Sequence, residues 1–186
     1  MQKRMAVNRM VLNAAMIAVY VVLSMPFMVI SVGGLKITFE HFPVVLSAVV
    51  LGPVDAMFIG GIGELINQLT SFGFTPTTLL WILPIVIRGG FLGLCGKVLK
   101  KEMSRQAILR SKVPIIFLIV CVLSGLISSI FNTLALYVDS KMFGYYTFAL
   151  VFGALTVRLL LSVITSVLIV FATKPILHAI KHESFK

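Results

Sequence analysis

Three charged residues lie within apolar stretches that are long enough to cross a bilayer. Arg88 and Arg158 each lie near the middle of such a stretch, and Glu64 lies at a similar depth in a third. A charged side chain is costly in hydrocarbon, so it usually faces a protein interior or a water-filled cavity, where it pairs with another charge or binds a ligand. These residues therefore predict a polar site inside a membrane protein.

The three charges do not balance, and two interpretations follow. In the first, Glu64 pairs with Arg88 or Arg158 and locks the helices together. This leaves one buried cation, which is unfavourable unless water or a ligand reaches it. In the second, an anionic or strongly polar ligand supplies the missing counter-charge, because the planar fork of Arg binds a carboxylate through two hydrogen bonds.

Further polar and aromatic residues gather toward the same half of the predicted bundle. Glu64, Asn67 and Gln68 are spaced i, i+3 and i+4, so they share one helix face. Trp81 and Phe72 offer aromatic faces on which a flat ring can stack. The residues predicted to contact a ligand are Lys36, Glu64, Asn67, Gln68, Phe72, Thr77, Trp81, Arg88, Asn132 and Arg158.

Catalytic and metal chemistry have little support in the sequence. The three histidines, His41, His178 and His182, are too dispersed to form a metal cluster or a His-based triad. The glycines before Lys97 lack the spacing of a phosphate-binding loop. Gly89 and Gly93 instead predict a close contact between two helices. We therefore expect no catalytic residue, no metal and no cofactor, and the chain is not predicted to be an enzyme.

Composition identifies the class of protein. The mean hydropathy of +1.09, with 59% apolar and 12% charged residues, lies outside the range of soluble proteins. About 20 apolar residues are needed for a helix to cross the hydrocarbon core. The expected fold is an all-α integral membrane protein, a six-transmembrane-helix bundle forming one domain over residues 1–186. Its spans are predicted at about 10–30, 41–52, 54–70, 77–97, 113–137 and 147–173.

The second and third spans are predicted to form a tight hairpin. Gly52 and Pro53 break the helix between them, and Asp55 is expected to cap the helix that follows.

The charge distribution predicts the orientation of the bundle. Of the formal net charge of +10, most comes from basic clusters before the first span, at 97–112 and at 174–186. Six spans place all three clusters on one side, and the positive-inside rule makes that side, with both termini, cytoplasmic. Basic residues that flank apolar spans suit anionic lipid headgroups, so the chain is expected to contact the lipid bilayer and no nucleic acid.

Two other features have alternative interpretations. Ala14 and Ala18 lie one turn apart with Ala15 beside them, a small-residue face that suits either packing inside the bundle or contact with a separate subunit. The residues alone favour internal packing. Gly33 and Gly34 in the predicted outer loop suit either a mobile cover over a pocket or a plain turn.

Several segments together resemble one family. They are ITFEHFP at 37–43, LGPVDA at 51–56, GGIGE at 60–64 and FTPTTL at 74–79, the last running on to Arg88. With the Ala14 and Ala18 face, they resemble the substrate-binding S components of energy-coupling factor (ECF) vitamin transporters. The resemblance covers nearly the whole chain.

The resemblance implies a protein of the bacterial plasma membrane, crossing it several times, that captures a vitamin-like small molecule from outside. Its pocket would lie in the outer half of the bundle, under the loop between the first two spans. The partners implied are a transmembrane coupling subunit and two cytoplasmic ATPase subunits, which use the ATP. In this family the docking face is the Ala-rich first helix, so the resemblance favours Ala14, Ala15 and Ala18 as contacts with the coupling subunit.

The substrate is less closely defined. The segment 74–93 looks most like the folate-type branch, so a folate-like substrate is favoured. Pantothenate, another vitamin or a queuosine precursor are alternatives. Outside this family, the composition also fits a non-transporting helical scaffold, or a self-sufficient channel or carrier.

Overall fold

The computed structural model describes residues 2–25, 30–32, 35–37, 39–106 and 115–183. Most of this part of the chain is α-helical. The helices are α1 (Gln2–Ser24), α2 (Phe42–Val50), α3 (Pro53–Phe72), α4 (Thr78–Gln106), α5 (Ile115–Met142) and α6 (Leu155–Glu183). A short π-helix, η2 (Ala149–Gly153), precedes α6.

Four stretches of the described residues are long and apolar enough to cross a membrane: Val7–Ser24, Thr78–Gly96, Ile115–Met142 and Ala149–Thr173. The predicted all-α membrane fold is confirmed, whereas six separate crossings remain a prediction. The second predicted span contains only the nine residues of α2. At about 1.5 Å per residue, this helix covers less than half of a hydrocarbon core about 30 Å thick.

The helix α2 lies at the centre of the bundle. Every residue from Pro43 to Val49 is buried, and the helix contacts α1, α3, α4 and α6. Apolar side chains around its whole circumference explain this position, because a helix without a polar face is stable only when all its sides are covered. Its neighbours can therefore hold the polar site around a fixed core.

A sharp turn joins α2 to α3, as the Gly-Pro pair predicts. Gly52 has a φ of 110°, which favours glycine, and Pro53 begins α3 with its ring-fixed φ. The cap differs from the expectation. Gly52 holds the N-cap position, while Asp55 lies in the first turn of α3 and binds a residue of α1 instead.

The first helix is shorter at its end than predicted. It ends at Ser24, and the predicted outer loop contains two short antiparallel strands, β1 (Ile30–Val32) and β2 (Leu35–Ile37). Ile30 is paired with Ile37, and Val32 with Leu35. Alternating apolar and polar residues around a two-residue Gly-Gly connection are typical of such a hairpin. Gly33, Gly34 and the side chain of Lys36 lie outside the described residues.

Glycines bring α4 against the start of α3. A Cβ added at Gly89 would lie 2.9 Å from the backbone of Ala56, and one added at Gly93 would lie 2.2 Å from Cα of Pro53. The close helix contact predicted from these two glycines is confirmed, and it fixes the depth of α4 relative to α3.

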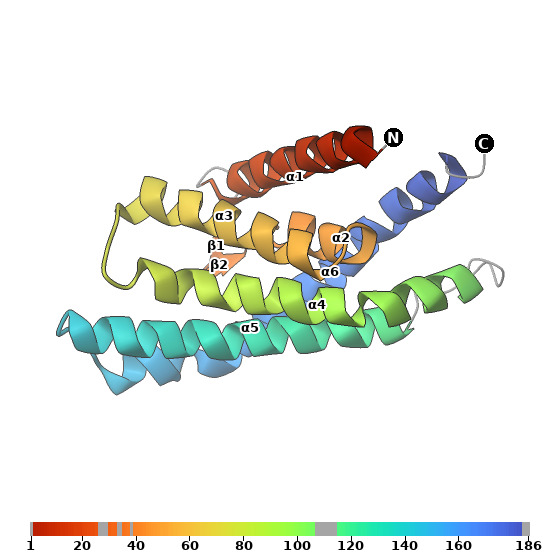
Figure 1. Ribbon diagram of the computed structural model, residues 1–186. Helices are drawn as coiled ribbons and strands as arrows, with labels where there is room; N and C mark the ends of the chain where they lie inside the picture. The colour runs from red at the N-terminus through yellow and green to blue at the C-terminus, as the bar shows by residue number, and fades with distance from the viewer. Residues whose placement is uncertain (1, 26–29, 33–34, 38, 107–114, 184–186) are drawn as a thin grey trace.

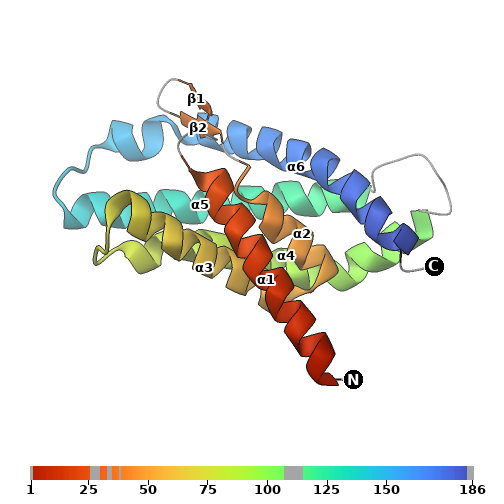
Figure 2. The same ribbon diagram turned by 90° about the horizontal axis from the view of Figure 1, so that it is seen from above.

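The helices α3, α4 and α5 run side by side, and α1 lies at the edge of the bundle beside α3 (Figure 1). The start of α1 and the end of α6 point toward the same end of the molecule (Figure 1). We call the opposite end, which carries the connections 73–77 and 143–148, the loop end. Figure 2 shows α1 crossing obliquely over α3. Within its apolar stretch only 6% of residues are buried, so most of α1 faces outward.

Candidate functional site

A polar cavity of about 60 Å³ lies between α1, α3, α4, α5 and the turn that precedes α2. Its walls come from the half of the bundle nearer the loop end, since Trp81 lies in the first turn of α4 and Asn132 in the second half of α5. The lining residues are Tyr20, Glu40, His41, Glu64, Trp81, Pro84, Ile85, Ser128 and Asn132.

Glu64 is held in place by three neutral donors. The hydroxyl of Tyr20 donates to Oε2 at 2.9 Å. The side-chain amide of Asn67 donates to the same oxygen at 3.1 Å, and that of Gln68 donates to Oε1 at 2.7 Å. The helix face predicted from their spacing is therefore formed, and Asn67 and Gln68 orient the carboxylate rather than line the cavity themselves.

Arg88 is buried beside the cavity and does not line it. Its side chain is 2% exposed. Nη2 donates to the hydroxyl of Ser166 on α6 at 3.2 Å, while Nε has no hydrogen-bond partner among the described residues. The guanidinium also interacts electrostatically with Glu40 and Tyr20, at longer range. Arg88 is thus a buried cation that lies next to the polar cavity without lining it.

Arg158 has a different environment from the one its depth predicts. It lies in the first turn of α6 and reaches back to η2, donating to the backbone carbonyls of Leu150 at 3.1 Å and Val151 at 3.3 Å. A π-helix leaves backbone carbonyls without regular partners at its end, and a guanidinium is well suited to bind two of them.

Neither arginine pairs with Glu64. Within the described part of the chain, Arg9 forms an ion pair with Asp55, and the imidazole of His41 lies 4.0 Å from Glu40, a contact that is an ion pair only when His41 is protonated. The interpretation in which Glu64 locks the bundle by pairing with Arg88 or Arg158 is therefore wrong.

The remaining predicted contacts are spread over the loop end. Thr77 is buried and donates to Asp139 of α5, which also accepts a hydrogen bond from Tyr145. This bond raises the pKa of Tyr145 to about 12, so the phenol stays protonated and keeps the 143–148 connection against α5. Phe72 is 67% exposed at the end of α3, away from the cavity lining.

Of the ten residues predicted to bind a ligand, the cavity is lined by Glu64, Trp81 and Asn132. Sequence reasoning missed Tyr20 and Ser128, which bring hydroxyl groups from α1 and α5, and also Glu40 and His41, which lie in the turn before α2. The sequence did contain a signal for Tyr20, because the hydroxyl of a Tyr within an apolar span requires a hydrogen-bond partner. An isolated Ser among apolar residues gives no comparable signal.

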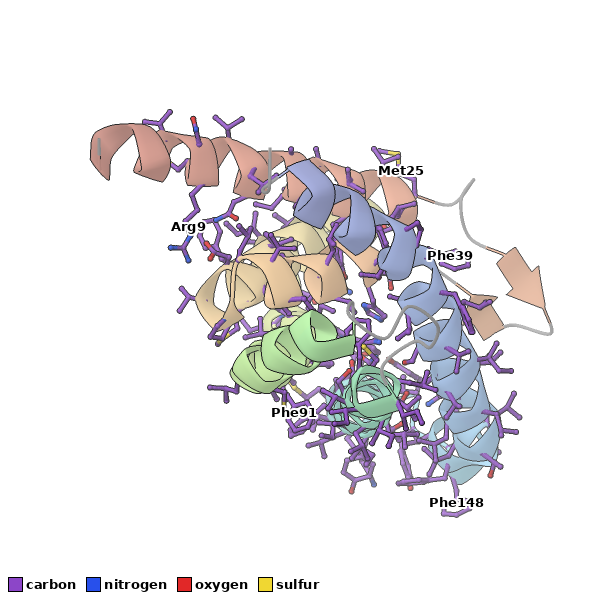
Figure 3. All side chains as sticks on the ribbon, turned by 90° about the vertical axis from the view of Figure 1, so that its right-hand side faces the viewer. Arg9, Met25, Phe39, Phe91 and Phe148 are labelled. Carbon is purple, nitrogen blue, oxygen red and sulfur yellow. The ribbon has the colours of Figure 1, made fainter. Side chains whose placement is uncertain are left out.

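The small-residue face of α1 does not pack inside the bundle. Ala14, Ala15 and Ala18 are all exposed. The opposite side of the helix carries Arg9, which points from α1 toward the neighbouring helices (Figure 3) and binds Asp55. The packing interpretation of these alanines is therefore wrong, and their face is open to another molecule.

Comparison with known proteins identifies the family. The family model for the substrate-specific component of ECF transporters matches residues 8–180. A search among individually curated proteins finds no significant match. Within the described residues, no three His, Cys, Asp or Glu side chains lie together in a way that could hold a metal ion. Because the family match includes every element that lines the cavity, the chain belongs to the substrate-specific components of ECF transporters, multi-pass membrane subunits that bind a substrate for a larger transporter.

Proposed function

We propose that the chain captures a vitamin or related micronutrient outside a bacterial cell and delivers it through a coupling module driven by ATP. The observation that carries this proposal is the polar cavity around Glu64, in the half of the bundle nearer the loop end. Such a cavity inside an apolar bundle is the default location of a ligand site. The positive-inside rule turns the loop end outward.

The cavity must open to admit a nutrient. Its volume of about 60 Å³ is small beside ordinary ligand pockets, which start at about 300 Å³. Glu40 and His41 are the lining residues that precede α2 instead of lying within a helix. We infer that this turn and the β1–β2 hairpin next to it move outward when the substrate enters, as expected of a cover over the pocket.

A folate-like molecule is the favoured substrate. Trp81 can stack on a flat ring, and Glu64 can accept hydrogen bonds from ring N–H groups. Pantothenate, another vitamin and a queuosine precursor are the alternatives.

The coupling partner is proposed to bind the exposed face of α1. Ala14, Ala15 and Ala18 leave a shallow surface on which a helix of the transmembrane coupling subunit can approach closely. That subunit would be joined to two cytoplasmic ATPases. The exposure of all three alanines supports this role.

Mass spectrometry of small molecules that co-purify with the full chain tests the capture of a nutrient. We expect one micronutrient in near-stoichiometric amount, and ATP-dependent uptake of it by cells that hold the chain together with the ECF coupling module. Cells with the module alone are the control. A chain that retains no small molecule and adds no uptake would be a non-transporting scaffold.

A further inference from the structure

We propose that the polar cavity binds the donor-rich edge of a planar nitrogen heterocycle, with Glu64 accepting N–H hydrogen bonds and Trp81 lying against the ring. The inference rests on the proposed function, because it names the chemical class of the captured nutrient. It also assigns the ring as the part of the substrate that occupies the cavity.

The charge of the lining favours a donor over an anion. The described lining residues include two carboxylates, Glu40 and Glu64, and neither Lys nor Arg. The nearest buried cation, Arg88, lies behind the wall with Nη2 engaged by Ser166, and Arg158 binds carbonyls of η2. A carboxylate placed in the cavity would therefore meet the like charge of Glu64 and no guanidinium among the described lining residues.

Glu64 has acceptor capacity left for a ligand. An ionised carboxylate offers about four lone-pair sites, and three donors occupy Glu64 in the structure. All three donors are neutral, so none of them cancels its charge. They instead fix its orientation, which prepares the carboxylate to accept from a ligand N–H without losing further freedom.

An unpartnered hydroxyl on the facing helix points to a ligand independently. Ser128 of α5 lines the cavity and is 3% exposed, and its Oγ has no hydrogen-bond partner among the described residues. A buried hydroxyl without a partner is unfavourable, so its presence indicates a group that is supplied from outside. Asn132 lies one turn further along the same face and adds an amide.

Two walls thus present complementary chemistry to one flat molecule. Glu64 accepts from one edge, Ser128 and Asn132 bind the carbonyl or ring nitrogen at the other, and the indole of Trp81 provides a stacking surface. Amino-substituted pyrimidine, purine and pteridine rings have this pattern of donors and acceptors. Pantothenate has no ring and fits this arrangement poorly.

Two pairs of matched rings test the proposal on the purified full chain. Pterin and lumazine share a bicyclic ring, but in lumazine a carbonyl replaces the amino group and the ring nitrogen on its far side gains a hydrogen, so the two adjacent donors of pterin are no longer side by side; guanine and xanthine differ in the same way. Affinity is measured by calorimetry. The fluorescence lifetime of Trp81, the single tryptophan of the chain, reports whether the ring lies in the cavity.

We expect at least one amino ring to bind about tenfold or more tightly than its dioxo partner, the effect of one lost hydrogen bond to a charged group. The Trp81 lifetime should shorten on binding. Glu64→Gln should weaken binding of the amino ring and bring the ratio within the pair close to one. Glu183→Gln, at the end of α6, removes a carboxylate elsewhere and should change neither value.

Equal affinity within both pairs, or no binding by any of the four rings, would overturn the inference, and this result needs no variant to be folded. If the chain still retains a nutrient and supports uptake, the proposed function stands and only the ring assignment fails. Loss of co-purified nutrient and of uptake would instead remove the proposed function.

Discussion

Arg9 on α1 donates hydrogen bonds from Nε to both carboxylate oxygens of Asp55 on α3, at 3.1 Å to Oδ1 and 3.0 Å to Oδ2. Nη2 of Arg9 also donates to Oδ2, and Asn13 donates to Oδ1 at 2.8 Å. The Arg9 side chain is 55% exposed, whereas that of Asp55 is 8% exposed. This cluster anchors α1, a largely outward-facing helix, to the bundle at the end opposite the loop end. It therefore joins α1, the helix that carries the exposed Ala14, Ala15 and Ala18, to the start of α3.

Replacing Arg9 with Met should separate coupling from capture. Of the side-chain donors that bind Asp55 in the described structure, the amide of Asn13 then remains, so α1 is held less firmly and its outer face loses a fixed orientation. We expect uptake by the complete transporter to fall severalfold while the purified protein retains its nutrient. Arg9→Lys keeps the charge but loses the planar fork, so its uptake should lie between that of the unchanged protein and that of Arg9→Met. If Arg9→Met loses the nutrient as well, the cluster supports the cavity and not the docking face.

Bulky side chains on the alanine face should block the partner. Ala14→Trp and Ala18→Trp place an indole on an exposed surface, so the isolated protein should fold and bind as before, while uptake falls to the background. Leu123→Trp is the control, because Leu123 is also exposed but lies on α5, away from the alanines of α1. A similar loss in all three variants would indicate a general defect in membrane insertion.

Gly125 on α5 leaves room for Ser166, the serine that accepts a hydrogen bond from Arg88. A Cβ at this position would lie 2.5 Å from Oγ of Ser166 and 2.7 Å from Oγ of Ser162. We expect Gly125→Ala to lower stability by about 1–3 kcal/mol, the usual effect of overpacking, as a lower midpoint of thermal unfolding in detergent. At Gly153 the nearest atom to an added Cβ is 3.8 Å away. Gly153→Ala is therefore the control, and an equal effect of both variants would argue against a steric cause.

The sequence predicted the local features of this site, such as shared helix faces and turns, better than it predicted the contacts between distant helices. The shared face of Glu64, Asn67 and Gln68 follows from helical spacing, and the turn at Gly52 follows from backbone chemistry. Both were predictable because they depend on neighbours in the chain. The position of Arg158 within an apolar stretch was also readable, but its partners were not, because they are backbone carbonyls of the π-helix η2, an element that the sequence did not predict. Contacts between distant helices, such as Tyr20 with Glu64, depend on packing that periodicity does not encode.

The two arginines should respond differently to removal. Arg158→Met deprives the carbonyls of Leu150 and Val151 of their donor, so we expect a lower unfolding midpoint and unchanged retention of the nutrient. Arg88→Met removes a buried cation that has no carboxylate in direct contact among the described residues, and with it the cost of holding an unpaired charge away from water. We therefore expect the Arg88 variant to unfold at the same temperature or higher.

Comparing both variants by thermal unfolding and by mass spectrometry of the retained nutrient decides the roles of the two cations. Loss of the nutrient in Arg88→Met with full stability would mean that an anionic part of the substrate reaches behind the cavity wall. Loss in Arg158→Met at unchanged stability would contradict its assignment to η2, since the guanidinium would then serve the substrate and not the backbone.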